Sequence, residues 1–134
     1  MTDTIAAIAT GGAVTAIGVI RVSGRNAISA ADSIFRSKSG IKMSETIDRK
    51  LMYGELLNSD GDVIDVCLCT VSRAPNSYSG EDTAEFHCHG SPVVLTEGLR
   101  ALFKVGVRQA EAGEFTKRAF LNGILDLSQA EAVI

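Results

Sequence analysis

The stretch Pro75–Gly90 concentrates side chains that could do chemistry, because it combines turn formers, carboxylates and both histidines of the chain. Apolar and polar residues alternate near its end, with Ala84, Phe86 and Cys88 set against Glu85, His87 and His89. This period of two predicts a β-strand whose polar face carries a carboxylate beside imidazoles. That face could bind a ligand, or its histidines could serve as acid and base. No serine, cysteine or aspartate is placed by sequence to complete a triad, so histidines at a surface or ligand rim are the simpler interpretation.

Arg21 is a second candidate, because it interrupts the otherwise apolar run Ile17–Val22. Burying a guanidinium without a partner is costly, so Arg21 must reach solvent or a sheet edge, or meet a carboxylate. Glu85 is the obvious partner if the two predicted strands are neighbours. The pair would then be a structural ion pair or the lining of a pocket. In a pocket, the arginine would bind an anionic group, and the glutamate would accept two parallel hydrogen bonds from a heterocycle.

Cysteine and glycine patterns give weaker indications of metal or nucleotide sites. Cys67, Cys69 and Cys88 cannot all pair, and buried free thiols are the simple interpretation. The alternative is a zinc site that these cysteines share with the two histidines, but the CxxC spacing is missing. The glycine pair Gly11-Gly12 precedes a predicted strand and lacks the lysine of a phosphate-binding loop. A turn is therefore expected there, and no metal site is predicted.

The elements that position these residues follow from periodicity and turn signals. Two strands are predicted at Thr4–Ala9 and Ala16–Val22, and a hairpin at Lys50–Leu57 and Val63–Val71 around Asp60-Gly61. Helices are predicted from Ala27 to Phe35, from the Ser91-Pro92 start to a stop near Gly106, and over Glu114–Leu121 and Ser128–Ile134, with a short strand at Val107–Ala110. These elements predict an α+β fold, with a mixed or antiparallel sheet and helices packed on one side.

Composition limits the class of protein. The chain has 134 residues, of which 46% are hydrophobic and 22% charged, and its net charge is -3. This length suits one ordinary domain, and the acidic balance argues against tight nucleic-acid binding by this chain alone. The apolar run Ala13–Val22 is too short and too broken for a membrane span, and Asp3 does not suit a signal peptide. A cytoplasmic location without membrane contact is expected, and the missing C-cap of the last helix suggests a fragment.

Five segments together carry a close resemblance to a known family. They are Asp3–Thr10, Ala16–Gly24, Pro75–Gly90, Gly113–Gly123 and Leu125–Ala132. On these segments the chain resembles the N-terminal region of the bacterial and organellar MnmE/TrmE family of tRNA-modification GTPases. The last two segments are highly specific.

The resemblance implies a folate-binding, homodimer-forming α/β domain at residues 1–118, similar to tetrahydrofolate-binding aminomethyltransferase-like domains. Residues 119–134 would begin a truncated helical domain. Carried over by position, the family's folate contacts fall on Arg21, Glu85 and Ile124. Ile124 is a departure, because the family commonly has arginine or lysine there; an aliphatic side chain can pack on an aromatic ring but gives no cation. The first loop also departs, since Gly11-Gly12-Ala13 replaces the usual Pro-Pro-Gly and should be less rigid.

The resemblance also implies the setting in which this domain works. In the family, an MnmG/GidA-like flavoprotein is the partner, and the pair adds an aminomethyl or carboxymethylaminomethyl group to the wobble uridine, position 34, of certain tRNAs. The folate would be 5-formyltetrahydrofolate or methylenetetrahydrofolate. GTP, Mg²⁺ and K⁺ belong to a GTPase domain whose Gly-x-x-x-x-Gly-Lys-Ser/Thr motif is absent from this sequence. The stretch alone is expected to be inactive. The alternative is a dimerisation and docking module whose folate site is weakened or lost.

Overall fold

The computed structural model describes residues 3–10 and 16–133. The predicted glycine loop at Gly11-Gly12-Ala13 and the end of the last helix at Ile134 lie outside the described residues. Within them, the strands form one sheet in the order β3-β4-β5-β6-β2-β1-β7. Their bounds are β1 Ile5–Ile8, β2 Ile17–Ser23, β3 Phe35–Ser37, β4 Met52–Leu57, β5 Val63–Ser72, β6 Thr83–His89 and β7 Arg108–Gln109. All neighbours are antiparallel except β1 and β7, so the sheet is mixed, as predicted.

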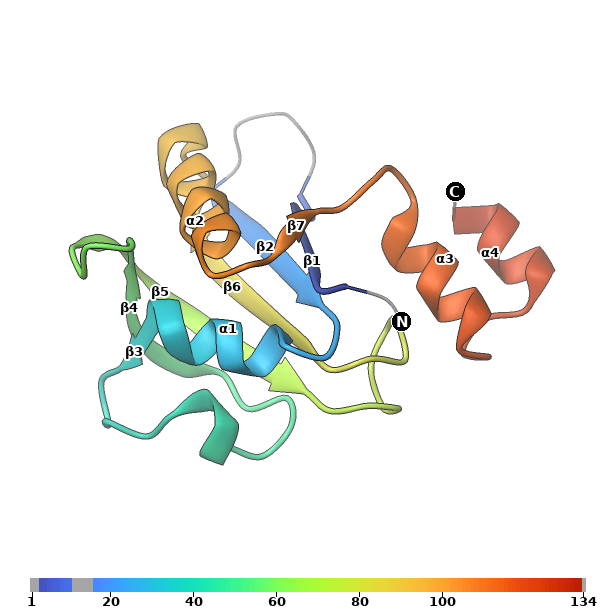
Figure 1. The fold of residues 1–134 in the computed structure, drawn as a ribbon, viewed down its shortest axis with the longest axis horizontal. Helices are drawn as coiled ribbons and strands as arrows, with labels where there is room; N and C mark the ends of the chain where they lie inside the picture. Colours follow the sequence, from blue (N-terminus) through green and yellow to red (C-terminus); the bar gives the residue numbers. More distant parts are fainter. Residues whose placement is uncertain (1–2, 11–15, 134) are drawn as a thin grey trace.

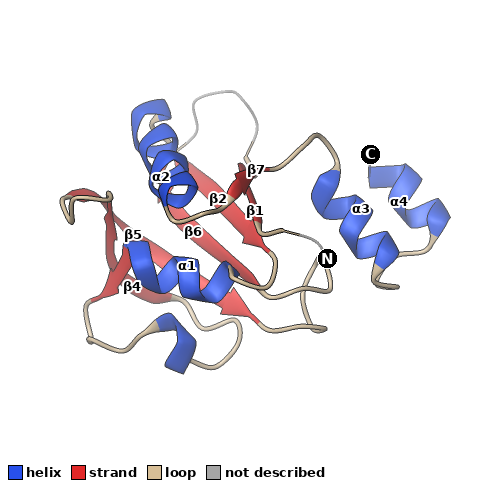
Figure 2. Cartoon of the chain, in the orientation of Figure 1, coloured by secondary structure: helices blue, strands red, loops and turns tan. Residues whose placement is uncertain are grey.

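Two helices cover one face of this sheet, as Figures 1 and 2 show. They are α1, Ala27–Ile34, and α2, Pro92–Lys104. A second pair, α3 at Glu114–Leu121 and α4 at Leu127–Val133, lies to the side, beyond β1 and β7 (Figure 1). The predicted α+β class, with helices packed on one side, is confirmed. No helix in the described ranges is long and apolar enough to cross a membrane.

The core lies between the sheet and helices α1 and α2. Alternate residues of the central strands point into it, among them Ile20, Val22, Val71, Ala84 and Phe86. Two glycines permit the close approach of α2. A Cβ added at Gly98 would lie 2.6 Å from Cδ1 of Ile20, and one at Gly18 would lie 2.7 Å from Cδ1 of Leu95. Since α1 and α2 close this face, the opposite face of the sheet is the one left to carry a site.

The predicted hairpin, the paired strands β1 and β2, and the helices match the structure within a few residues. The first helix was expected to include Phe35, but it ends at Ile34, and Phe35 begins β3 instead. There Phe35 pairs with Leu56, and its ring lies 6.3 Å from that of Phe86. This core contact outweighs the helical spacing that predicted otherwise.

The start of α2 and the course of α3 bear on two further predictions. Ser91 holds the N-cap position of α2 and Pro92 is its first residue, as predicted, yet the serine side chain makes no capping hydrogen bond. Helix α3 runs through the expected boundary between residues 118 and 119, so the division into domains stays a prediction.

Candidate ligand-binding pocket

Three polar side chains form a row across the open face of the sheet. Arg21 of β2 stands opposite Glu85 of β6, which stands opposite Thr70 of β5. Nε of Arg21 donates a hydrogen bond to Oε2 of Glu85 at 2.8 Å. The pairing predicted from the two strands is therefore confirmed. It follows directly from the register, since antiparallel strands place opposite residues on the same face.

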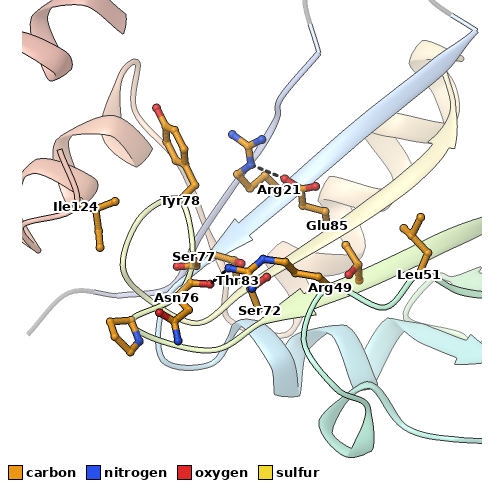
Figure 3. A pocket seen from close by; sticks show the side chains of 12 residues that line it. Arg21, Arg49, Leu51, Ser72, Asn76, Ser77, Tyr78, Thr83, Glu85 and Ile124 are labelled. Carbon is orange, nitrogen blue, oxygen red and sulfur yellow. Dashed lines mark hydrogen bonds and ion pairs between the residues drawn. The ribbon is translucent and has the colours of Figure 1, made fainter.

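This row lies in a cavity of about 550 Å³, shown in Figure 3. That volume is within the range of pockets that bind small organic ligands. The lining comes from the sheet, from the segment before β4, from the loop between β5 and β6, and from the segment after α3: Arg21, Arg49, Leu51, Thr70, Ser72, Pro75, Asn76, Ser77, Tyr78, Thr83, Glu85 and Ile124. The structure thus brings together the three residues singled out in the sequence, Arg21, Glu85 and Ile124.

Arg21 is held from several sides. Besides Glu85, it contacts the faces of two aromatic rings: its guanidinium carbon lies 5.4 Å from the ring centre of Tyr78 and 5.8 Å from that of Phe115. Cation–π contacts of this kind fix the position of a guanidinium. Arg21 is therefore engaged before any ligand arrives, and an anionic group in this pocket would benefit from another cation.

Glu85 stays ionised in this setting. Burial acts to raise its pKa, but hydrogen bonds from Arg21 and His87 outweigh it, so the pKa of Glu85 is lowered from the ordinary 4.5. Nε2 of His87 lies 3.1 Å from Oε1 of Glu85. The carboxylate is about a quarter exposed, at 28% of the side-chain surface. Each of its oxygens retains a lone pair, so it can still accept hydrogen bonds from the N–H groups of a ligand.

The loop that closes the pocket is tied to α3. The hydroxyls of Tyr78 and Thr116 lie 2.7 Å apart, and the side-chain amide of Asn122 donates to the carbonyl oxygen of Ser79 at 2.9 Å. Because Tyr78 also contacts Arg21, these bonds align one wall of the pocket with the sheet. Helix α3 therefore belongs to the architecture of the pocket.

A buried ionic network reinforces the same contact. Arg118 of α3 is only 4% exposed, and its guanidinium lies 3.0 Å from Glu81 and 3.3 Å from Glu114. Glu81 also accepts a hydrogen bond from the hydroxyl of Ser23 at 2.8 Å, which ties the loop to the end of β2. Buried charges of this kind are stable only when they are fully paired.

The sheet separates the histidines from the cysteines. His89 pairs with Asp65 at 2.8 Å and is largely exposed, away from the pocket lining. The three cysteines are buried on the helix-facing side, whereas the histidines of β6 point to the opposite side. A hydrogen bond with Cys88 and burial raise the pKa of the Cys67 thiol. In the described part of the chain, no three such side chains are grouped to hold a metal.

Sequence reasoning missed two residues that shape the pocket. Tyr78 falls in the Pro75–Gly90 stretch, and its neighbouring glycine and serines signalled only a turn. Arg49 sits between predicted elements, and its backbone φ of 63° is a left-handed conformation. That conformation is uncommon for a side chain other than glycine, asparagine or aspartate, so no sequence signal predicts it.

The fold and the pocket define a small α+β domain with a charged cavity on the open face of its sheet. The chain belongs to the family described as GTP-binding protein TrmE N-terminus, whose pattern matches residues 4–124. It is 52% identical over 134 residues to tRNA modification GTPase MnmE of Bacteroides thetaiotaomicron, and 49% identical over 132 residues to that of Clostridioides difficile. Each match covers 98% of this chain and 28% of the relative. The chain thus spans less than a third of the length of these relatives.

Proposed function

We propose that this chain binds a reduced folate, 5-formyltetrahydrofolate or methylenetetrahydrofolate, in the pocket between Arg21, Glu85 and Ile124. The observation that carries the proposal is the convergence of these three residues, from β2, β6 and the segment after α3, on one cavity of about 550 Å³. A pterin ring with a benzoyl tail is a ligand of suitable size for such a cavity. The chemistry of the lining also suits it.

Each part of the lining has a role in this proposal. Glu85, kept ionised by its lowered pKa, accepts hydrogen bonds from adjacent N–H groups of the pterin. Tyr78 and Ile124 supply apolar surface on which a flat ring packs. The buried Thr70 hydroxyl, which has no hydrogen-bond partner among the described residues, is available to a polar atom of the ligand. Arg21 orients Glu85.

The wider function belongs to the same proposal. The relatives are named as tRNA modification GTPases, and this chain corresponds to 28–29% of the first two of them. We propose that it is the N-terminal folate-binding domain of such a protein in the cytoplasm. With an MnmG/GidA-like flavoprotein, that protein would add an aminomethyl or carboxymethylaminomethyl group to the wobble uridine, position 34, of certain tRNAs. The folate would supply the one-carbon unit, while GTP, Mg²⁺ and K⁺ would bind a separate GTPase domain.

Homodimerisation by this domain is also proposed. The open face of the sheet exposes apolar side chains at the pocket and beside it: Leu51, which lines the pocket, Tyr53 and Val66 are 51%, 53% and 40% exposed. Their positions alternate with buried residues of β4 and β5, so they gather on one face. Contiguous exposed apolar surface favours a protein interface. A second copy of the chain is the partner in this proposal.

Calorimetric titration with 5-formyltetrahydrofolate tests the pocket. We expect Glu85→Ala to weaken binding by about 1–3 kcal/mol, because the pterin N–H groups would lose their acceptor. Glu55→Ala is the matched control: Glu55 also pairs with an arginine across neighbouring strands, Arg36 at 2.8 Å, but it does not line this pocket.

Unchanged affinity in Glu85→Ala would refute the pocket. If no heat is seen at high micromolar ligand while sedimentation shows a tight dimer, the docking-module alternative is the correct one.

A further inference from the structure

The charges that line the pocket leave one cation without a carboxylate. Arg21, Arg49 and Glu85 are the charged residues of the lining, and Arg21 is already paired with Glu85. Within residues 3–10 and 16–133, Arg49 forms no ion pair with a carboxylate; the neighbouring Asp48, whose pKa the charge of Arg49 helps to lower, is paired with Arg73 instead. Nη2 of Arg49 donates to the carbonyl oxygen of Asn76 at 2.6 Å. The lining as a whole therefore carries one excess positive charge.

The backbone holds this cation in place at a cost. Among the described residues, Arg49 is the one non-glycine residue with a positive φ. Its N–H donates to the carbonyl oxygen of Val71 at 2.8 Å, and the preceding Asp48 pairs with Arg73 at 2.6 Å. These contacts anchor the segment to the end of β5 and keep the strained conformation. Strained residues persist where the surroundings fix them, and they concentrate at functional sites.

From this anchored backbone, the Arg49 side chain extends along the pocket. Figure 3 shows it reaching along the pocket toward the loop at Asn76, below the Arg21–Glu85 pair in that view. The residue is exposed, so its guanidinium keeps donors free for a ligand. An arginine fork binds a carboxylate with two parallel hydrogen bonds.

We propose that Arg49 binds the carboxylates of the ligand's glutamyl tail, so that the pocket selects folates with such a tail over analogues without one. This inference rests on the proposed folate function and adds the specificity of that site. Glu85 would bind the heterocyclic end, and Arg49 the anionic end. Additional γ-glutamyl residues should strengthen binding further, because the added carboxylates raise the local negative charge near the guanidinium.

Three ligands distinguish binding of the heterocyclic end from binding of the glutamyl tail. They are 5-formyltetrahydropteroic acid, which has no glutamate, 5-formyltetrahydrofolate, and the triglutamate of 5-formyltetrahydrofolate. Each is titrated into the 134-residue chain and into Arg49→Gln, Arg49→Lys and Arg49→Gly. We expect the wild type to bind the monoglutamate at least tenfold more tightly than the tailless ligand, and the triglutamate more tightly still. Arg49→Gln should lose most of this preference while binding the tailless ligand as before, and Arg49→Lys should keep part of it. Added salt should reduce the preference.

Control variants distinguish a direct contact between Arg49 and the glutamyl tail from misfolding or a purely structural role. Arg36→Gln removes a surface arginine outside the pocket and should leave the preference unchanged. Glycine adopts the left-handed backbone at position 49 without strain. If Arg49→Gly loses the preference for glutamylated ligands while its melting temperature is unchanged or higher, misfolding is excluded as the cause. Equal affinity of the wild type for tailless and glutamylated ligands would overturn the inference and leave folate binding intact. An equal loss of affinity for all three ligands in Arg49→Gln would also overturn the inference, since Arg49 would then act only by holding the loop at Asn76. Failure of every ligand to bind would refute the proposed function together with the inference.

Discussion

Arg118 is the one charged side chain that the described part of the chain buries, and its carboxylate partners come from α3, from the pocket loop and from Asp3. Replacing Arg118 with methionine keeps the bulk but leaves Glu81 and Glu114 without their shared cation. We expect the free energy of unfolding to fall by about 3–5 kcal/mol, because removing one partner of a buried ion pair is strongly destabilising. Glu114 keeps its contact with Arg108 and Glu81 its contact with Ser23 in this variant. Urea denaturation measures this change.

The control for Arg118 is an exposed pair on a different helix. Arg100 lies 3.4 Å from Glu97, and the two side chains are 61% and 40% exposed. Arg100→Ala should change the free energy of unfolding by no more than about 1 kcal/mol. Equal effects of the two substitutions would mean that the Arg118 network contributes no more than a surface contact.

Some residues of the site could be predicted from the sequence, and others could not. Arg21 and Glu85 could be found because each breaks an apolar or alternating pattern, and strand register then placed them opposite one another. Arg49 could not be found from the sequence, because its role depends on a backbone conformation set by a contact with Val71, a residue distant in sequence. Arg118 could not either, since it occupies an ordinary position in a helix and becomes buried only when α3 meets the loop.

At the scale of elements, the contact between the pocket loop and α3 depends on Gly80. Its φ is +81°, and an added Cβ would lie 2.7 Å from Cβ of Asn122 and 3.0 Å from Cγ1 of Ile124. Gly80→Ala should therefore push the loop away from α3, weaken the proposed folate binding and destabilise the fold. Gly61 in the β4–β5 turn is a matched control, with φ +84° and open space around it.

Thermal or urea unfolding of both variants isolates the packing contribution. Gly61→Ala should cost about 1–2 kcal/mol for the left-handed backbone alone. Gly80→Ala should cost about 1–3 kcal/mol more, since it adds overpacking against α3. If both glycines prove equally sensitive, the loop does not depend on close contact with α3.

Most strands and helices were predictable from periodicity and turn signals, because one face of each is buried against a common core. The hairpin β4–β5 is the clearest example, with Asp60-Gly61 at its turn. The short strand β3 and the 3-10 helix Met43–Glu45 were not predictable. Three residues are too few to show a period, and β3 forms because tertiary contacts of Phe35 override its helical pattern.

At the scale of the whole molecule, ion pairs set the response to acid. The pKa of Glu114 is lowered to about 2, first by a hydrogen bond from Arg108, and the same arginine lowers the pKa of Asp3 to about 2. Hydrogen bonds from Arg73 lower the pKa of Asp48 as well. Because these groups bind protons less readily when folded, their stabilisation is fully present above their ordinary values near 4 and is lost as pH falls toward 2.

We expect the free energy of unfolding to be nearly constant from neutral pH to about pH 5 and to decline steeply below about pH 4. Glu114→Gln should lower stability at neutral pH and flatten this decline, because an amide has no proton to gain. Denaturation series at several pH values measure the slope. A variant with the wild-type slope would show that Glu114 does not contribute to the acid response.

The ion pairs of Asp3 with Arg108 and Arg118 join residues more than a hundred positions apart, and β1 pairs with β7 across a similar separation. During synthesis, β1 leaves the ribosome shortly before its antiparallel neighbour β2 but long before its other neighbour, β7. Its edge stays unpaired until Arg108 has emerged, and the pocket wall stays incomplete until Ile124 follows. Long-range pairing of this kind slows folding and prolongs exposure of apolar edges. The ligand pocket is therefore completed late on a growing chain, and under the proposed function a folate present at that moment would bind only the finished pocket.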